Sequence, residues 1–97
     1  MTDLPLELLR TFVVTVDTGS MAKAARTVAR TPSAVSLQMS RLGGLVGQPL
    51  FRRQGRAQVL TRAGEMLVPH AREILAASER AMPWRPRASW GEIASAS

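Results

Sequence analysis

Apolar residues recur at helical spacing near the start of the chain and predict two consecutive helices. In residues 5–18, the apolar positions that share one side of a helix are Leu6, Leu9, Phe12, Val13 and Val16. Gly19 supplies a left-handed stop, and Ser20 is a residue type that caps helices. A second, short helix is therefore expected from Met21 to about Ala29, with Met21, Ala24, Ala25 and Val28 pointing inward.

The segment TPSAVSLQMSRL, residues 31–42, predicts a third helix with two unlike sides. Thr31 is its N-cap and Pro32 its first residue, where a missing N–H costs nothing. One side is apolar, and the opposite side carries Ser33, Ser36, Leu37, Ser40 and Arg41. The apolar side is formed by Val35, Met39 and Leu42. Two helices joined by such a short turn fit a helix-turn-helix.

The end of this third helix is expected to fray or break. Gly43 and Gly44 each cost about 1 kcal/mol relative to alanine inside a helix. Beyond them, Leu45 and Val46 are expected to continue the apolar side, and Gly47 to end it.

The segment PLFRRQGRAQVL, residues 49–60, changes from helical spacing to a hairpin pattern. Leu50 and Phe51 are the expected anchors, and the tip between the two short strands is basic. A flap of this kind beside a helix-turn-helix is called a wing.

A fourth helix is expected from a cap at Thr61 to about Met82. Its apolar stripe is longer than so small a core can cover, so a second copy of the chain is the simplest partner. The residues predicted for this dimer interface are Leu67, Val68, Ala71, Ile74, Leu75, Ser78 and Met82. Pro83 and Pro86 then stop the helix. The predicted fold class is mainly α: a winged helix-turn-helix over residues 1–60, a dimerisation helix over 61–82, and a flexible tail over 83–97.

Composition restricts the chemistry that the chain can perform. The 97 residues include no cysteine and one histidine, His70, so neither a disulfide nor a thiolate or histidine-cluster metal site is expected. No cofactor is predicted, and a lone histidine offers no catalytic constellation for an enzyme. The start lacks a secretory signal and no run of 18 uncharged apolar residues occurs, which predicts a cytoplasmic protein without a membrane partner.

The positive charge is concentrated in the middle of the chain. The net charge is +6, yet residues 20–62 contain no acidic residue and eight basic ones: Lys23, Arg26, Arg30, Arg41, Arg52, Arg53, Arg56 and Arg62. Such a block attracts polyanions, whether nucleic acid, an anionic membrane surface or an acidic protein. A solvated basic surface is the alternative that charge alone leaves open.

The small outer side of the third helix favours DNA among these partners. The major groove of B-DNA admits one α-helix, and residues near its N-terminal end reach the bases. Ser33 and Ser36 then suit bases or phosphates, and Leu37 suits a thymine methyl. Longer reach fits Gln38 to adenine and Arg41 to guanine. The remaining predicted contacts are to phosphates, from the helix start at Thr31, Pro32 and Ser33, and from Ser20, Lys23, Arg52, Arg53 and Arg56.

Each of these contacts also has an alternative interpretation that does not involve DNA. The serines and the wing arginines can be merely solvated, Leu37 can pack under the wing, and Arg41 can pair with an acid on another helix.

Several motifs in order resemble a known family. These are Gly19-Ser20, Ala24-Ala25, Thr31 to Ser36, Leu50 to Arg53, and Thr61 with Gly64. Over residues 5–82 the chain is similar to the N-terminal DNA-binding segment of LysR-type bacterial transcriptional regulators. The resemblance implies a winged helix-turn-helix with a dimerising linker helix, and dimers that bind interrupted inverted repeats near promoters. It implies DNA contacts at Thr31, Pro32, Ser33, Ser36, Leu37, Arg53 and Arg56.

Two positions depart from the family pattern, which has an acid near Gly43-Gly44 and often a long polar or basic residue at position 37. Family members also continue into an effector-binding domain, of which these residues contain no part, so no small-molecule effector site is expected in this chain. An excised domain, a truncated or frame-shifted product and a free-standing regulator are all compatible with the sequence.

We therefore expect a sequence-specific regulator that binds double-stranded DNA as a homodimer, with higher oligomers left open. The alternative is a dimerisation module that pairs with full-length relatives and modulates them.

Overall fold

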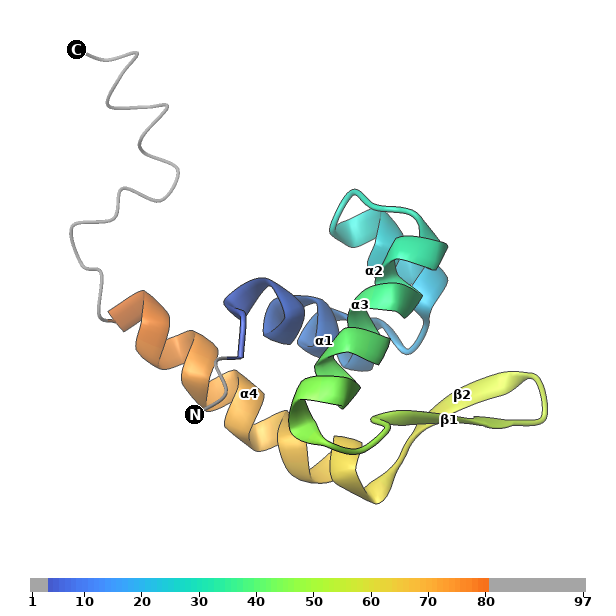
Figure 1. Ribbon diagram of the computed structural model, residues 1–97. Helices are drawn as coiled ribbons and strands as arrows, with labels where there is room; N and C mark the ends of the chain where they lie inside the picture. Colours follow the sequence, from blue (N-terminus) through green and yellow to red (C-terminus); the bar gives the residue numbers. More distant parts are fainter. Residues whose placement is uncertain (1–3, 81–97) are drawn as a thin grey trace, which may run out of the picture.

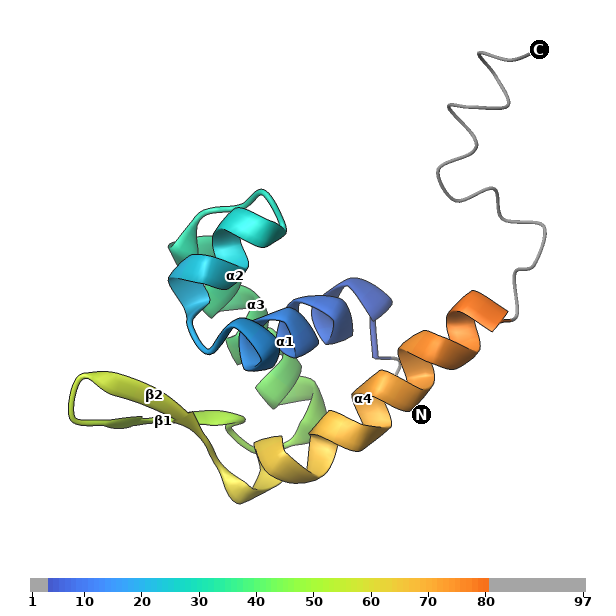
Figure 2. The same ribbon diagram turned by 180° about the vertical axis from the view of Figure 1, so that it is seen from behind.

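The computed structural model describes residues 4–80, which form four helices and one hairpin (Figure 1). The elements are α1 (Leu6–Thr18), α2 (Met21–Thr27), α3 (Pro32–Val46), β1 (Phe51–Gln54), β2 (Ala57–Leu60) and α4 (Arg62–Arg80). The hairpin extends to one side of the helices and α4 to another, as both views show (Figures 1 and 2). The predicted architecture is confirmed, and within the described residues no helix is both long and apolar enough to cross a bilayer.

The core surrounds α1, which packs against α2, α3 and α4. Leu9 and Phe12 are fully buried, as are Val35 and Leu42 of α3. Burying side chains of this size contributes about 1.5–3 kcal/mol each. The core is one cluster that also includes Leu8, Ala24, Ala25, Met39, Leu50, Leu67 and Ala71.

The buried side of α1 differs from the predicted one. Leu8, Thr11 and Thr15 are buried, whereas Leu6 exposes 39% of its surface. Because three helices surround α1, its buried arc is wider than a single apolar stripe. Thr15 is accommodated because its hydroxyl donates a hydrogen bond to the Thr11 carbonyl at 2.7 Å.

The predicted caps of α2 and α3 are confirmed. Gly19 ends α1 with a φ of +77°, and Ser20 Oγ accepts a hydrogen bond from the Lys23 amide at 3.2 Å. Thr31 Oγ1 accepts from the Ala34 amide at 3.1 Å. These local bonds begin each helix at the expected residue.

The expected break at Gly43-Gly44 does not occur, since α3 runs without interruption to Val46. Gly43 is buried, and a Cβ there would lie 3.0 Å from the Gln48 carbonyl oxygen. The Gly43 carbonyl accepts two amide hydrogen bonds, from Gly47 at 2.8 Å and from Gln48 at 3.0 Å. The chain therefore folds back closely over this turn, where glycine leaves room for the Gln48 carbonyl. Leu45 and Val46 are 39% and 37% exposed, so they do not continue the apolar side as expected.

The hairpin is attached to the helical body at its base. Phe51 packs its ring edge against Phe12 with centroids 5.8 Å apart. The Thr61 hydroxyl donates to the Pro49 carbonyl at 2.7 Å and accepts from the Gly64 amide at 3.0 Å. The Thr61 amide donates to the Leu50 carbonyl at 3.0 Å. Thr61 therefore joins the hairpin to the start of α4, as well as forming the predicted cap.

Helix α4 packs along α1 and contributes to the same core. Leu67 and Ala71 belong to the core cluster, and Val68 and Leu75 lie against it. Leu67 and Ala71, which were predicted for the dimer interface, are therefore covered by the chain's own core. Met82 and the predicted tail, 83–97, lie outside the described residues.

An ion pair also joins these two helices. The Arg72 guanidinium donates to Asp17 at 2.6 Å and 3.3 Å, and it holds the pKa of that carboxyl below its usual value. Both side chains are about half exposed, so the pair orients α4 on α1 more than it stabilises the fold.

Candidate nucleic-acid interface

The outer side of α3 presents short polar side chains and one leucine. Ser33, Ser36 and Ser40 are exposed, and Leu37 is 54% exposed. Within residues 4–80, none of these three serine hydroxyls forms a hydrogen bond to another residue. The opposite side, with Val35, Met39 and Leu42, is buried as predicted. The outer side of α3 is thus open to a partner and has little bulk to keep that partner away.

Gln38 does not belong to this outer side. Its Nε2 donates a hydrogen bond to Glu7 Oε2 of α1 at 3.3 Å, and Arg30 forms an ion pair with the same carboxylate. Its Oε1 is buried and lacks a hydrogen-bond partner among the described residues. The Gln38 side chain therefore lies at the junction of α1 and α3, away from the outer side on which it was predicted to contact adenine.

Arg41 lies beside the same junction. A hollow of about 620 Å³ is lined by Glu7, Arg30, Gln38 and Arg41. Glu7 is paired with Arg30, and Arg41 forms no ion pair within residues 4–80, so the alternative in which it pairs with an acid on another helix is not seen. Its exposed guanidinium stays available at the edge of α3.

The strand register divides the wing arginines between two faces. Arg53 pairs with Gln58, and Arg52 pairs with Val59. Directly paired residues project to the same side of a sheet, and successive residues project to opposite sides. Arg53 therefore shares the side of Phe51 that faces the helices, and Arg52 lies on the other side. The structure separates Arg52 from the other predicted wing contacts.

Arg53, Arg56 and Ser20 come together from distant parts of the sequence. They line one hollow of about 370 Å³ between the start of α2 and the wing. No acidic side chain lines it. Lys23 is exposed on the first turn of α2 but does not line this hollow. Two guanidinium groups beside a helix start suit an anionic group such as a phosphate.

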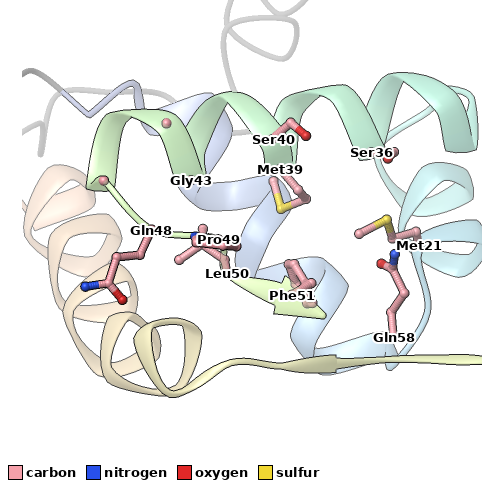
Figure 3. A pocket seen from close by; sticks show the side chains of 12 residues that line it. Met21, Ser36, Met39, Ser40, Gly43, Gln48, Pro49, Leu50, Phe51 and Gln58 are labelled. Carbon is pink, nitrogen blue, oxygen red and sulfur yellow. The ribbon is translucent and has the colours of Figure 1, made fainter. Parts of the chain in front are cut away.

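A second hollow, of about 480 Å³, separates α3 from the wing (Figure 3). Ser36 and Ser40 line it from α3 and Gln58 from β2, and the amide of Gln58 points toward Met21. Gln58 was not predicted as a site residue. The alternation of side chains along the hairpin could have identified Gln58, because any residue paired with Arg53 must project to the same side of the hairpin.

The start of α3 is exposed where the site was predicted. Thr31, Pro32 and Ser33 all face solvent. The Thr31 oxygen already accepts a bond from within the helix, and its hydroxyl proton stays available to donate. Pro32 has no N–H and the Ala34 amide donates to Thr31, so the Ser33 amide and the positive end of the helix dipole add to the attraction for an anion.

Comparison with known proteins decides the family. Residues 6–65 match the model described as bacterial regulatory helix-turn-helix protein, lysR family. The chain belongs to the LysR family. The transcriptional regulator DgdR of Burkholderia cepacia is 49% identical over 81% of this chain and 27% of its own length. PecT of Dickeya dadantii is 48% identical over 81% of this chain and 25% of its own length. The chain thus spans about a quarter of these LysR-family relatives.

Solved LysR-family structures share the fold. The DNA-binding domain (DBD) of CbnR, solved in a complex with DNA, is 30% identical to this chain and has a TM-score of 0.76. The alignment covers 88% of this chain and 97% of that domain. The BenM DBD, in a complex with catB site 1 DNA, is 26% identical with a TM-score of 0.77, covering 87% of this chain and 94% of that one. The winged helix-turn-helix is therefore confirmed by complete domains of similar shape.

The two departures from the LysR-family pattern have different structural settings. A Cβ on Gly43 would lie 3.0 Å from the Gln48 carbonyl oxygen, whereas a Cβ on Gly44 would meet nothing within 4 Å. Leu37 stands exposed on the outer side of α3. The first departure therefore concerns folding, and the second concerns what the helix contacts.

Proposed function

We propose that this chain binds double-stranded DNA sequence-specifically, with the outer side of α3 in the major groove. One observation carries the proposal: the acid-free segment 20–62 folds so that Ser20, Arg53 and Arg56 line one hollow near an α3 with small outer residues. The DNA complexes of the CbnR and BenM DBDs support it, because these domains align with most of this chain.

The proposed contacts fall into two classes. Ser33, Ser36, Leu37 and Arg41 contact base edges, because they lie on or beside the open side of α3. The start of α3 with Ser20, Lys23, Arg53 and Arg56 holds phosphates, which fix the position of the helix without reading sequence. Gln38 and Arg52, which were predicted to contact DNA, are not among the proposed contacts.

A dimer completes the proposal. Ile74 of α4 is 38% exposed, and α4 extends away from the hairpin (Figure 2). With Ser78 and the half-buried Leu75, Ile74 gives a second copy an apolar seam to pack against. A two-fold dimer presents two α3 helices to an inverted repeat, and control of transcription follows from occupying such an operator.

The experiment measures how salt affects affinity for a duplex selected from a random pool. Each phosphate contact that is lost lowers the magnitude of the slope of log K against log salt by about one unit. Arg53→Ala should do so without changing sequence preference, because a phosphate contact carries no sequence information.

Arg52→Ala is the matched control, because it removes the same charge from the neighbouring position on the opposite side of β1. Its effect on the slope should be clearly smaller. A flat salt response in the unmodified chain would favour the alternative, a module that pairs with full-length relatives and scarcely binds DNA itself. Equal effects of the two variants would contradict the proposed face of the wing.

A further inference from the structure

The outer side of α3 lacks the long polar side chains that read a donor and acceptor pattern. Its projecting residues are three serines and Leu37, which is the most exposed large hydrophobic residue outside α4 among residues 4–80. Ser33 precedes Leu37 by one helical turn and Ser40 follows it by nearly one, so the leucine projects from a row of short hydroxyls. Arg41 stands at the edge of this row and Gln38 is held by Glu7.

A leucine on this side has one favourable partner in the major groove. It neither donates nor accepts hydrogen bonds, and the apolar group that base pairs present there is the methyl on C5 of thymine. The same methyl, on the same ring carbon, is present in 5-methylcytosine. Cytosine and uracil lack it. Leu37 therefore distinguishes pyrimidines by their methyl group.

Leucine does not distinguish thymine from 5-methylcytosine, and the neighbouring serine hydroxyls do not do so either. A serine hydroxyl both donates and accepts, so it bonds equally to O4 of thymine and to the N4 amino group of cytosine. A pyrimidine held by leucine and serine is thus recognised with its methyl as the deciding group, whichever base carries it.

We propose that Leu37 makes α3 a reader of 5-methylpyrimidines. At one position of each half-site, affinity depends on a C5 methyl, and 5-methylcytosine replaces thymine there. The inference rests on the proposed entry of α3 into the major groove. Its consequence is a regulator whose binding changes when cytosine at that position is methylated.

The test begins with the duplex selected from a random pool. Each thymine is replaced in turn by 2′-deoxyuridine, symmetrically in both half-sites, which removes the methyl and leaves every hydrogen-bonding group. At one position the affinity should fall by about fourfold per half-site, the factor that corresponds to about 0.8 kcal/mol for one buried carbon group. Cytosine at that position should bind weakly, and 5-methylcytosine should regain about the same factor.

Leu37→Ala assigns the effect to the side chain. The variant should still bind, with its salt slope unchanged, and should no longer distinguish thymine from uracil. Leu45→Ala is the matched control, because Leu45 is also an exposed leucine of α3, at 39%, and lies away from Ser33 and Leu37 on the helix. It should keep the full methyl preference.

The outcomes separate the inference from the proposed function. Specific, salt-dependent binding that tolerates uracil at every position would overturn the inference and leave the proposed function intact. A methyl preference that persists in Leu37→Ala would also overturn it, since another group would then read the methyl. Failure of the unmodified chain to bind any duplex would contradict the proposed function itself.

Discussion

Leu37 and Gln38 are adjacent in sequence, yet their side chains lie in different surroundings. Leu37 projects outward, whereas Gln38 donates to Glu7 and lies close to the Glu7–Arg30 ion pair. One residue step turns a helix by about 100°, because 3.6 residues complete a turn. That rotation is enough to move a side chain from a binding surface to a helix junction.

Gln38→Ala should therefore weaken the fold slightly and leave base preference unchanged. It removes one hydrogen bond at a partly exposed junction, so the free energy of unfolding should fall by about 0.5–1.5 kcal/mol. Urea denaturation measures this, and binding to a set of single-base variants of the selected site measures preference. A loss confined to adenine at one position would restore Gln38 as a base contact.

Residue roles were predictable where the cause is local. Thr31, Pro32 and Ser20 were assigned correctly because a cap depends on residues within one turn. The contact of Gln38 with Glu7 was not predicted, because Glu7 lies 31 residues earlier in the chain. No periodicity connects two such positions, so only the packing of α1 on α3 reveals the contact.

At the scale of the elements, two glycines determine how α3, the hairpin and α4 meet. A Cβ on Gly64 would lie 2.3 Å from the Leu50 carbonyl oxygen and 2.7 Å from a Leu60 methyl. A Cβ on Gly43 would lie 3.0 Å from the Gln48 carbonyl oxygen, which is a tight but less severe contact. Both close contacts involve backbone atoms, which cannot turn aside as a flexible side chain does.

Gly64→Ala should accordingly destabilise the protein by about 1–3 kcal/mol, the usual cost of forcing extra volume into a packed site. Gly44→Ala is the matched control within a helix, because a Cβ there meets nothing within 4 Å. It should stabilise the fold by up to about 1 kcal/mol through helix propensity. Chemical denaturation of both variants checks this, and a larger loss for Gly44→Ala would contradict the assignment.

The elements differ in how well the sequence predicted them. Helix propensity suggested a break at Gly43-Gly44, but a close backbone approach decides that position. The hairpin was placed correctly because its turn residues and alternation are local. The buried side of α1 was only partly correct, since its extent depends on three packing partners that propensity does not contain.

At the scale of the whole molecule, α4 packs into the core on one side and extends past it on another. Leu67 and Ala71 face the chain's own helices, whereas Ile74 is 38% exposed. The apolar stripe was correctly recognised, but its period cannot distinguish an intramolecular partner from a second copy. The split between Ala71 and Ile74 becomes visible only when α1 is in place.

Ile74→Glu should therefore convert the proposed dimer into a monomer that remains folded. A buried, unpaired carboxylate in the seam costs several kcal/mol, while in the monomer it faces water. Leu67→Glu should instead unfold the chain, because that site is in the core. Sedimentation velocity with circular dichroism separates these results.

Leu45→Glu places the same charge at a site of equal exposure, 39%, on α3 and should stay dimeric. If Ile74→Glu sediments as a dimer, the copies associate through another surface.

The fold-back at the end of α3 has a consequence for how this kind of domain diversifies. The offset between α3 and the hairpin is set by hydrogen bonds to main-chain carbonyls: the Gly43 carbonyl accepts from Gly47 and Gln48, and the Pro49 and Leu50 carbonyls accept from Thr61. Ser33, Ser36 and Leu37 take no part in those bonds. Point mutations at these three sites can therefore change the outer side of α3 while its framework is inherited unchanged.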